Sequence, residues 1–361
     1  MRGRLAGLLL GGSWAMAGMA GACARQDAAT PVLAAPLRAG RFGSLRDFVL
    51  VALPGSGPSN PAAPNPARFV FIDRFEVTRG DWLRFAAAAE GQAVDAAAAA
   101  CGGDPTLPVS RLDLRQARAF AQWRFARLPS AGEWAAAVGD GRTRFPWGNR
   151  IDPARANTGE LGILEPLPVG TFESGRRGLG WPYDLIGNAS EWTESVPLGW
   201  FAERWPTGDG AGEVPGIDAE LARRRVVAAP ALAVWQSLPG VLPALWTVCA
   251  GGDEVPREVV GGDFQSPMTE QSELVLAGDR RLRLGLRLAV APHELLHQLV
   301  EHSGDVAAED LELVRRFLAR PGHREVLLPP WRQSGGDAAT AGAARPLVRL
   351  LRDVLGAPES R

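Results

Sequence analysis

Hydrophobic positions in the first half of the chain form short runs separated by Gly, Pro and Asn. Residues 48–53 and 68–77 are rich in Val, Phe and Ile and are bounded by turn residues, which predicts two β-strands. Three short helices are predicted after them, at Thr78, Asp113 and Ser130. Each of these residues can cap a helix, and each has a carboxyl or amide side chain three positions later.

Beyond Val138 the periodic pattern fades, and the chain is rich in Gly, Pro, Asn and Trp. So little regular structure requires interactions other than apolar packing, and a structural cation is one expectation. Residues 196–255 are predicted to form an irregular insertion. Closing strands are predicted at 259–264 and 282–290, and the apolar spacing that follows predicts helices over 292–361.

The N-terminus has the layout of a secretory signal. Arg2 and Arg4 precede an apolar stretch that ends in small residues and then Cys23, which resembles the lipobox of bacterial lipoproteins. The sequence therefore predicts a signal peptide over 1–22, and a lipidated cysteine with a polar tether over 23–41. Cleavage that leaves Cys23 unmodified and an uncleaved membrane anchor are the alternatives.

The amino-acid composition excludes several classes of binding partner and of catalytic chemistry. The 361 residues are 46% hydrophobic and 22% charged, which excludes a wholly disordered chain. The net charge is −1, so nucleic acid is not an expected partner. Every one of the 39 basic residues is arginine, which excludes lysine Schiff-base chemistry. Once Cys23 is lipidated, Cys101 and Cys249 are left, either as one disulfide or as two inert thiols.

A series of motifs in one order resembles the sulfatase-modifying-factor family, over residues 42–291. This family is led by the formylglycine-generating enzyme, and it includes domains of ergothioneine-type sulfoxide synthases and of a pyoverdine-maturation protein. The resemblance implies an α+β fold, a compact domain related to C-type lectins with little regular structure and bound calcium, to which the predicted C-terminal helices are added. The motifs are Phe75-Glu76-Val77-Thr78, Arg127-Leu128-Pro129-Ser130-Ala131-Gly132-Glu133-Trp134, Phe145-Pro146-Trp147-Gly148-Asn149, Gly187-Asn188-Ala189-Ser190-Glu191-Trp192, Gly261-Gly262 and Gly285-Leu286-Arg287.

The chain departs from the family where the chemistry is expected. The formylglycine-generating enzyme holds copper(I) with two cysteines, and alignment on the Gly-Gly motif places Ser266 and Gln271 at those positions. A hydroxyl and an amide are poor ligands for a cuprous ion, so copper is not an expected cofactor. The sulfoxide synthases take iron ligands from a separate histidine-bearing domain, and no histidine precedes His293 here. The sequence does not define an iron site.

The resemblance also implies calcium ligands. A hard cation takes six to eight oxygens, and a Gly-Asn turn followed by Glu can supply carbonyl and carboxylate oxygens together. The alternative is that Asn188 and Glu191 only hydrogen-bond the loop. The first predicted calcium site consists of Gly187, Asn188, Ala189 and Glu191, and a second, incomplete one consists of Asn157 and Thr158.

One further motif, unrelated to the family, matches the zinc-protease pattern HExxH. His293 and His297 lie one helical turn apart, and Glu294 would activate water. Pro292 places His293 in the first turn of its helix, where a rigid ligand is hard to hold. A solvated amphipathic helix is the alternative.

These observations predict an exported, lipid-anchored protein of the cell envelope, attached to the membrane through its lipid. Its central domain is predicted to be a binding or structural module without formylglycine-generating activity. A non-heme metal-dependent oxidoreductase acting on a small molecule or peptide is the first alternative, and a zinc hydrolase at His293 and His297 is the second. The predicted contact surface contains Asp263, Ser266, Gln271 and Trp192.

Overall fold

The computed structural model describes residues 42–54, 69–88, 104–139, 141–196, 256–304, 306–334 and 345–356. All of them belong to one unit, Arg38–Arg361. The predicted signal peptide, lipidated Cys23 and tether lie outside the described residues, as do Cys101, Cys249 and the insertion from residue 197 to 255. No helix within the described ranges is long and apolar enough to cross a membrane.

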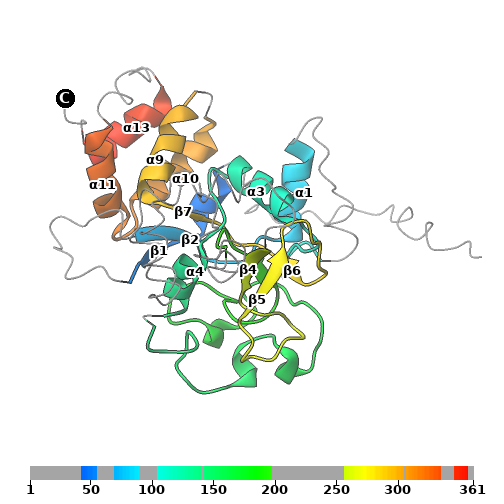
Figure 1. The fold of residues 1–361 in the computed structure, drawn as a ribbon. Helices are drawn as coiled ribbons and strands as arrows, with labels where there is room; N and C mark the ends of the chain where they lie inside the picture. Colours follow the sequence, from blue (N-terminus) through cyan, green and yellow to red (C-terminus); the bar gives the residue numbers. More distant parts are fainter. Residues whose placement is uncertain are drawn as a thin grey trace, which may run out of the picture. The chain divides into compact units, whose positions relative to one another are not determined.

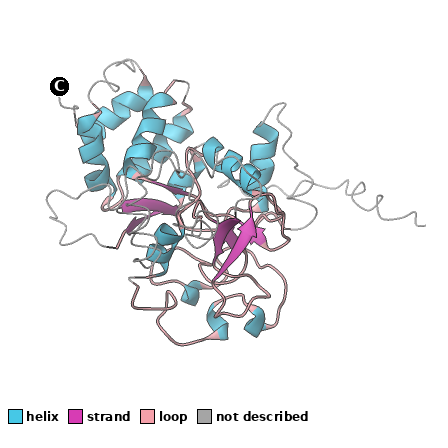
Figure 2. Cartoon of the chain, viewed as in Figure 1, coloured by secondary structure: helices cyan, strands magenta, loops and turns pink. Residues whose placement is uncertain are grey.

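Within the described residues, seven short strands form two sheets. Figures 1 and 2 show these sheets between the helices and the loops. The three-stranded sheet has the order β1-β2-β7 and is antiparallel, and its strands are β1 Phe48–Ala52, β2 Phe69–Asp73 and β7 Ala289–Val290. The four-stranded sheet has the order β5-β4-β3-β6, with strands β3 Ser190–Trp192, β4 Pro256–Val260, β5 Ser272–Leu276 and β6 Leu284–Gly285. In this sheet only β3 and β6 pair in parallel.

The first predicted strand is confirmed as β1, and the strand predicted at 68–77 is confirmed only as far as Asp73, where β2 ends. The closing strands differ from prediction. The run at 282–290 is not one strand, because β6 belongs to one sheet and β7 to the other. Between them the carbonyls of Leu286 and Leu288 accept hydrogen bonds from the backbone of Val77 and Asp73. The strand predicted at 259–264 already ends at Val260, because the two glycines after it take positive φ angles that break the ladder.

The three predicted helices are confirmed with their caps. They are α1 Arg79–Ala88, α3 Leu114–Trp123 and α4 Ala131–Val138. The Asp113 carboxylate accepts from the backbone N–H of Gln116 at 2.8 Å, and the Ser130 hydroxyl accepts from that of Glu133 at 3.1 Å. Both caps are reciprocated by the side chain three residues on, as the capping box requires.

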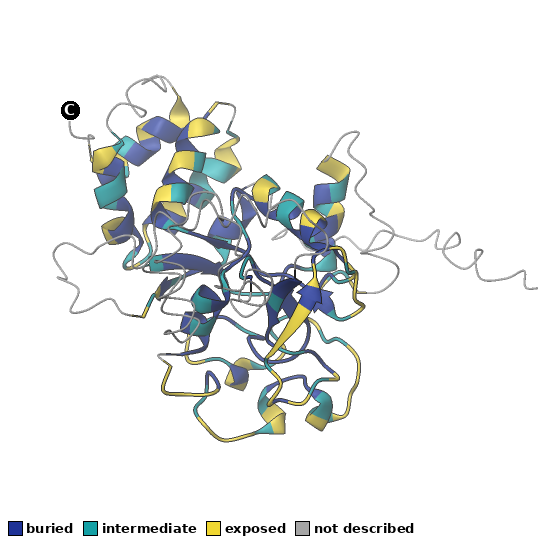
Figure 3. Cartoon of the chain, viewed as in Figure 1, coloured by how far each residue is buried: buried dark blue, intermediate teal, exposed yellow. Residues whose placement is uncertain are grey.

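The C-terminal helices share a core with the rest of the unit. They are α9 Pro292–Glu301, α10 Ala308–Leu318, α11 His323–Gln333 and α13 Pro346–Leu355. Strand β2 is largely buried (Figure 3). Phe71 on this strand lies with its ring centroid 5.0 Å from that of Phe317 and 4.9 Å from that of His323. Arg320 donates a hydrogen bond to the carbonyl of Phe48 at 3.1 Å. The predicted extension therefore covers the β1-β2-β7 sheet.

Between α4 and β3 the described chain contains only three short 3₁₀ helices, Pro153–Arg155, Gly159–Leu161 and Glu173–Gly175. This confirms the prediction of little regular structure there. Together with the mixed helices and sheets, it confirms the α+β class.

Candidate functional site

A buried ion pair joins the Gly-Asn loop to the last family motif. Arg287 Nη2 lies 2.7 Å from Glu191 Oε1, and Arg287 Nε donates to both carboxylate oxygens at 3.0 Å. The side chains are 0% and 1% exposed. Arg287 also donates to the carbonyls of Asp73 and Tyr183, at 3.0 and 2.8 Å. This guanidinium therefore holds three separate chain segments together.

Glu76 organises the loop from the other side. One carboxylate oxygen accepts from Asn188 Nδ2 at 2.6 Å, and the other accepts from the Ala189 backbone N–H at 2.9 Å. Asn188 Oδ1 accepts from the Leu167 N–H at 2.9 Å. Gly187 has a φ of 78°, and a Cβ there would lie 2.2 Å from the Asn157 carbonyl oxygen, so only glycine fits. Sequence reasoning did not single out Glu76 as a site residue, although it lies in the first family motif.

These contacts test whether the first predicted calcium site fits the ion. Glu191 already holds a guanidinium, and a second cation against the same carboxylate would meet its repulsion. Both amide atoms of Asn188 are engaged in hydrogen bonds. Gly187, Asn188, Ala189 and Glu191 therefore do not fit calcium in this arrangement, and their geometry matches the hydrogen-bonded alternative.

The second predicted calcium pair fits better but is incomplete. Asn157 Oδ1 is buried and has no hydrogen-bond partner, and the neighbouring Thr158 is also buried. Two oxygen-bearing side chains fall short of the six to eight oxygens that calcium takes. Within the described residues no group of three His, Cys, Asp or Glu side chains is placed to hold a metal.

Three buried acidic side chains, Glu76, Asp184 and Glu191, lie near one buried cation, Arg287. Burial, and then the charges of Asp184 and Glu191, raise the pKa of Glu76 well above its usual value. Burial also raises the pKa of Asp184 to about 6, although a hydrogen bond from the Gly170 N–H at 2.6 Å opposes the effect. The region therefore holds protons more tightly than the unfolded chain does.

This imbalance predicts a pH-dependent stability. The pKa of Asp184 is raised on folding, so its contribution is full below pH 4 and is lost as the pH rises through about 6. In the wild type, this effect should lower the free energy of unfolding by an amount on the order of 2–3 kcal/mol as the pH rises between these values. Asp184→Asn should not show this decrease, and its amide oxygen can still accept the hydrogen bond from Gly170. Urea unfolding of both proteins at pH 4.5 and 7.5 measures the effect. An equal change in unfolding free energy for both would contradict it.

The residues of the predicted contact surface, Asp263, Ser266, Gln271 and Trp192, do not line the cavity that is described in the next paragraph. Trp192 is fully buried and its indole N–H donates to the Leu112 carbonyl at 2.9 Å, so the prediction that it lines a surface is wrong. Asp263 is buried and accepts from the backbone N–H groups of Gln265 and Ser266, at 2.7 and 3.1 Å. Its role is to shape the turn. Gln271 Nε2 donates to the Met268 carbonyl at 3.3 Å.

A cavity of about 210 Å³ lies beside that turn. It forms where the start of α1 meets five loops that are distant in the sequence, and the segment that follows the Gly-Gly motif forms one wall. Its lining includes the polar side chains of Arg79, Ser110, Glu165, Asn188, Gln265 and Arg283. Sequence reasoning did not identify Arg79 or Arg283, because no local pattern marks residues that only the fold brings together.

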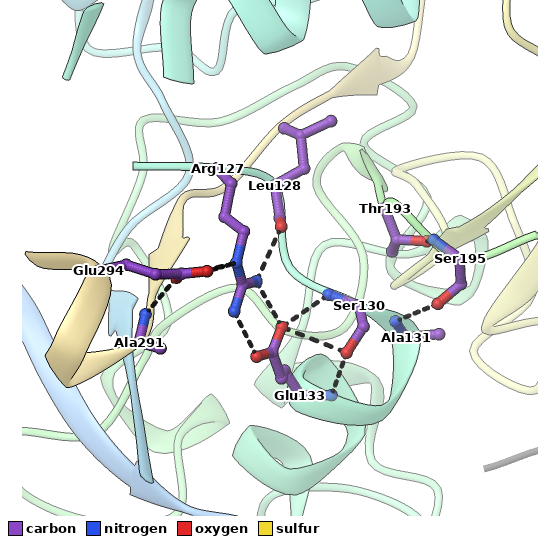
Figure 4. Close-up of polar contacts among 9 residues, drawn as sticks. All are labelled: Arg127, Leu128, Ser130, Ala131, Glu133, Thr193, Ser195, Ala291 and Glu294. Atoms are coloured by element: carbon purple, nitrogen blue, oxygen red, sulfur yellow. Dashed lines mark hydrogen bonds and ion pairs between the residues drawn. The ribbon is translucent and has the colours of Figure 1, made fainter. Parts of the chain in front are cut away.

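Glu294 of the HExxH segment makes an ion pair and a hydrogen bond within the fold (Figure 4). Arg127 donates to Glu133 at 2.7 Å through each of two nitrogens, and its Nε lies 3.2 Å from Glu294 Oε2. Glu294 also accepts from the Ala291 N–H at the start of α9, at 2.8 Å. His293 and His297 lie on the exposed face of this helix. The geometry matches the solvated amphipathic helix.

Comparison with known proteins supplies relatives for the central region. Residues 43–204 match the family model described as the sulfatase-modifying factor enzyme 1-like domain. The chain is 34% identical over 104 residues to a formylglycine-generating enzyme of Bos taurus, covering 25% of this chain and 27% of that protein. It is 36% identical over 99 residues to a hercynine oxygenase of Mycolicibacterium smegmatis, covering 26% and 23%.

A third relative is named inactive C-alpha-formylglycine-generating enzyme 2, from Bos taurus, with 37% identity over 101 residues and coverage of 24% and 33%. The matches therefore span about a quarter to a third of these relatives' lengths. Among solved structures, PvdO from Pseudomonas aeruginosa matches with 16% identity and a TM-score of 0.39, covering 67% of this chain and 90% of that chain. CarF matches with 17% identity and a TM-score of 0.41, covering 68% and 99%.

Proposed function

Because the chain carries a domain of the sulfatase-modifying factor enzyme 1-like family, we propose that it is a binding module of the cell envelope that does not generate formylglycine. The main support for this proposal is that Ser266 and Gln271 stand at the positions of the two copper-binding cysteines of the formylglycine-generating enzyme. Copper(I) selects thiolate ligands, and neither side chain supplies one. The relative named as inactive supports a role for the family scaffold without this reaction.

The hercynine oxygenase relative favours one alternative, a metal-dependent oxidoreductase. Such chemistry needs nitrogen or carboxylate ligands around an open metal position. The four histidines lie at His293, His297, His302 and His323, all on or beside the C-terminal helices and none among the residues that line the cavity. This placement favours the binding module over the oxidoreductase.

Metal analysis of the purified full chain separates the proposals. Protein without a transition metal, with or without calcium, supports the binding module. Stoichiometric iron or copper would overturn it in favour of the oxidoreductase, and stoichiometric zinc that is lost in His297→Ala would favour the hydrolase. Arg281→Gln, on an exposed side chain bonded to Glu273, serves as the matched surface variant.

Calcium is proposed only at Asn157 and Thr158. A ligand that binds only the folded state stabilises it by roughly 2.7 kcal/mol at a hundredfold excess over Kd. Chelation should therefore lower the melting temperature of the wild type and have a smaller effect on Asn157→Ala, which lacks the unpartnered amide oxygen. An unchanged wild-type melting curve would remove calcium from the proposal.

Export and lipid anchoring are proposed from the N-terminal sequence. An apolar stretch that ends in small residues and Cys23 supports acylation of that cysteine after cleavage. We expect Cys23→Ser to move the protein from the membrane fraction to the soluble envelope fraction. Cell fractionation followed by immunoblotting measures this, with Cys249→Ser as the matched control. Unchanged membrane association of Cys23→Ser would contradict the lipid anchor.

A further inference from the structure

The cavity beside the Gly-Gly turn has a definite chemical character. Its walls are mainly apolar, and two guanidinium side chains, Arg79 and Arg283, lie among its lining residues. Its volume of about 210 Å³ is below the range of about 300–1,000 Å³ that drug-sized ligands occupy. We propose that this cavity binds a compact carboxylate, in which one carboxylate group is attached to an apolar body of the size of a single amino acid.

Arg283 is held in place for such a contact. Its Nη1 donates to Gln265 Oε1 at 2.7 Å, and its Nε lies 3.4 Å from Asp263 Oδ2. Its backbone carbonyl accepts from the Ser190 N–H at 2.9 Å, which fixes the chain at the edge of the sheet. Within the described chain no partner contacts Nη2. A guanidinium that is already oriented loses little freedom when it binds a planar carboxylate.

Arg79 adds positive charge from another element. It is the first residue of α1, and its side chain is only partly exposed. Burial, and then the charge of the neighbouring Arg111, lower the pKa of Arg79, while Asp104 opposes the effect. A bound anion would stabilise the charged form of Arg79 and so offset both the effect of burial and the repulsion from Arg111.

The charge balance of the lining favours an anion. Glu165 is the one carboxylate among the lining residues, and its side chain is exposed. Asn188 and Gln265 are neutral. Asp263 is not a lining residue, but it lies 3.4 Å from Arg283 and offsets part of its charge, so the positive charge of the lining is smaller than the two arginines alone would give. This balance selects against a purely cationic ligand.

The apolar walls define the rest of the ligand. Leu164 and Leu282 are 51% and 56% exposed, and Phe264, which also belongs to the lining, is buried. Covering two half-exposed leucines is favourable at roughly 25 cal/mol per Å² of apolar surface removed from water. The ligand is therefore a free apolar acid or the C-terminal residue of a peptide, because both present a carboxylate next to an apolar side chain.

Isothermal titration calorimetry with matched neutral ligands tests this inference, which rests on the proposed binding module. N-acetyl-leucine and a tripeptide ending in leucine carry the carboxylate, and N-acetyl-leucinamide and the amidated tripeptide lack it. We expect at least one carboxylate ligand to bind tenfold or more tightly than its amide. Binding of the free acid alone indicates a small molecule as the source, and binding of the peptide alone indicates a protein C-terminus.

Variants locate the contact. Arg283→Gln and Arg79→Gln should each weaken binding of the carboxylate ligand at least tenfold, while Arg281→Gln, outside the lining, should leave it unchanged. The melting temperature of each variant reports whether it is folded. Failure of both carboxylate ligands to bind, equal binding of acid and amide, or unchanged binding by both folded variants would overturn the inference. None of these results would show formylglycine formation or a bound transition metal, so the proposed function is tested separately.

Discussion

Arg287→Ala is expected to lower the free energy of unfolding by about 3–5 kcal/mol, because it leaves a buried carboxylate without its partner. Arg287 is fully buried and makes three hydrogen bonds to Glu191 and others to the carbonyls of Asp73 and Tyr183. Arg287 also opposes the raised pKa of Glu76, so its removal would raise that pKa further. Urea unfolding at pH 7.5 measures the effect.

Two variants make this result specific to the ion pair. Arg281→Ala removes an arginine whose side chain is exposed, and it should change stability by less than about 1 kcal/mol. Arg287→Lys keeps the positive charge, but an ammonium group cannot reproduce the planar set of hydrogen bonds that the guanidinium donates to Glu191 and to the two carbonyls. This variant should therefore also be less stable than the wild type. A loss below 1 kcal/mol for Arg287→Ala would contradict the proposed role of this residue.

Phe317→Ala is expected to cost about 3–5 kcal/mol, the range for truncation of a buried aromatic side chain. Phe317 on α10 is fully buried against Phe71 on β2, with ring centroids 5.0 Å apart. The expected loss shows that the C-terminal helices stabilise the central domain and are not an independent appendage. Thermal and urea unfolding of the full chain measure it.

The matched control for this prediction lies one residue earlier. The Arg316 side chain is 74% exposed and bonded to Glu312, so Arg316→Ala should change stability by less than about 1 kcal/mol. A single unfolding transition that shifts only in Phe317→Ala confirms a shared core. Two separate transitions, of which only one shifts, would contradict it.

Local signals in the sequence predicted local structure well. The caps at Asp113 and Ser130 depend on residues three positions apart, and both form as expected. The family motifs likewise predicted the α+β class. The ends of the strands are not predictable from local sequence, because the chain passes from one sheet to the other after Gly285 and this passage depends on pairing with distant residues such as Val77.

The site was predictable only in part, because its contacts are distant in the sequence. Glu191 was assigned to calcium from its place in a loop motif, but its partner Arg287 lies 96 residues away. Trp192 was expected at a surface, although its indole N–H bonds the carbonyl of Leu112, 80 residues earlier. The cavity similarly combines Arg79 with Arg283. No spacing rule reveals pairs at such separations.

Incubation of the full chain with a sulfatase-type cysteine peptide, oxygen and copper, followed by mass spectrometry of the peptide, tests directly whether this protein generates formylglycine. We expect the cysteine to stay unconverted with or without copper, because Ser266 and Gln271 replace the two thiolates. A formylglycine-generating enzyme of the family serves as the positive control. Conversion of the peptide by this protein, lost in Cys249→Ser, would contradict the proposed binding module and show that the fold uses a thiolate from another part of the chain.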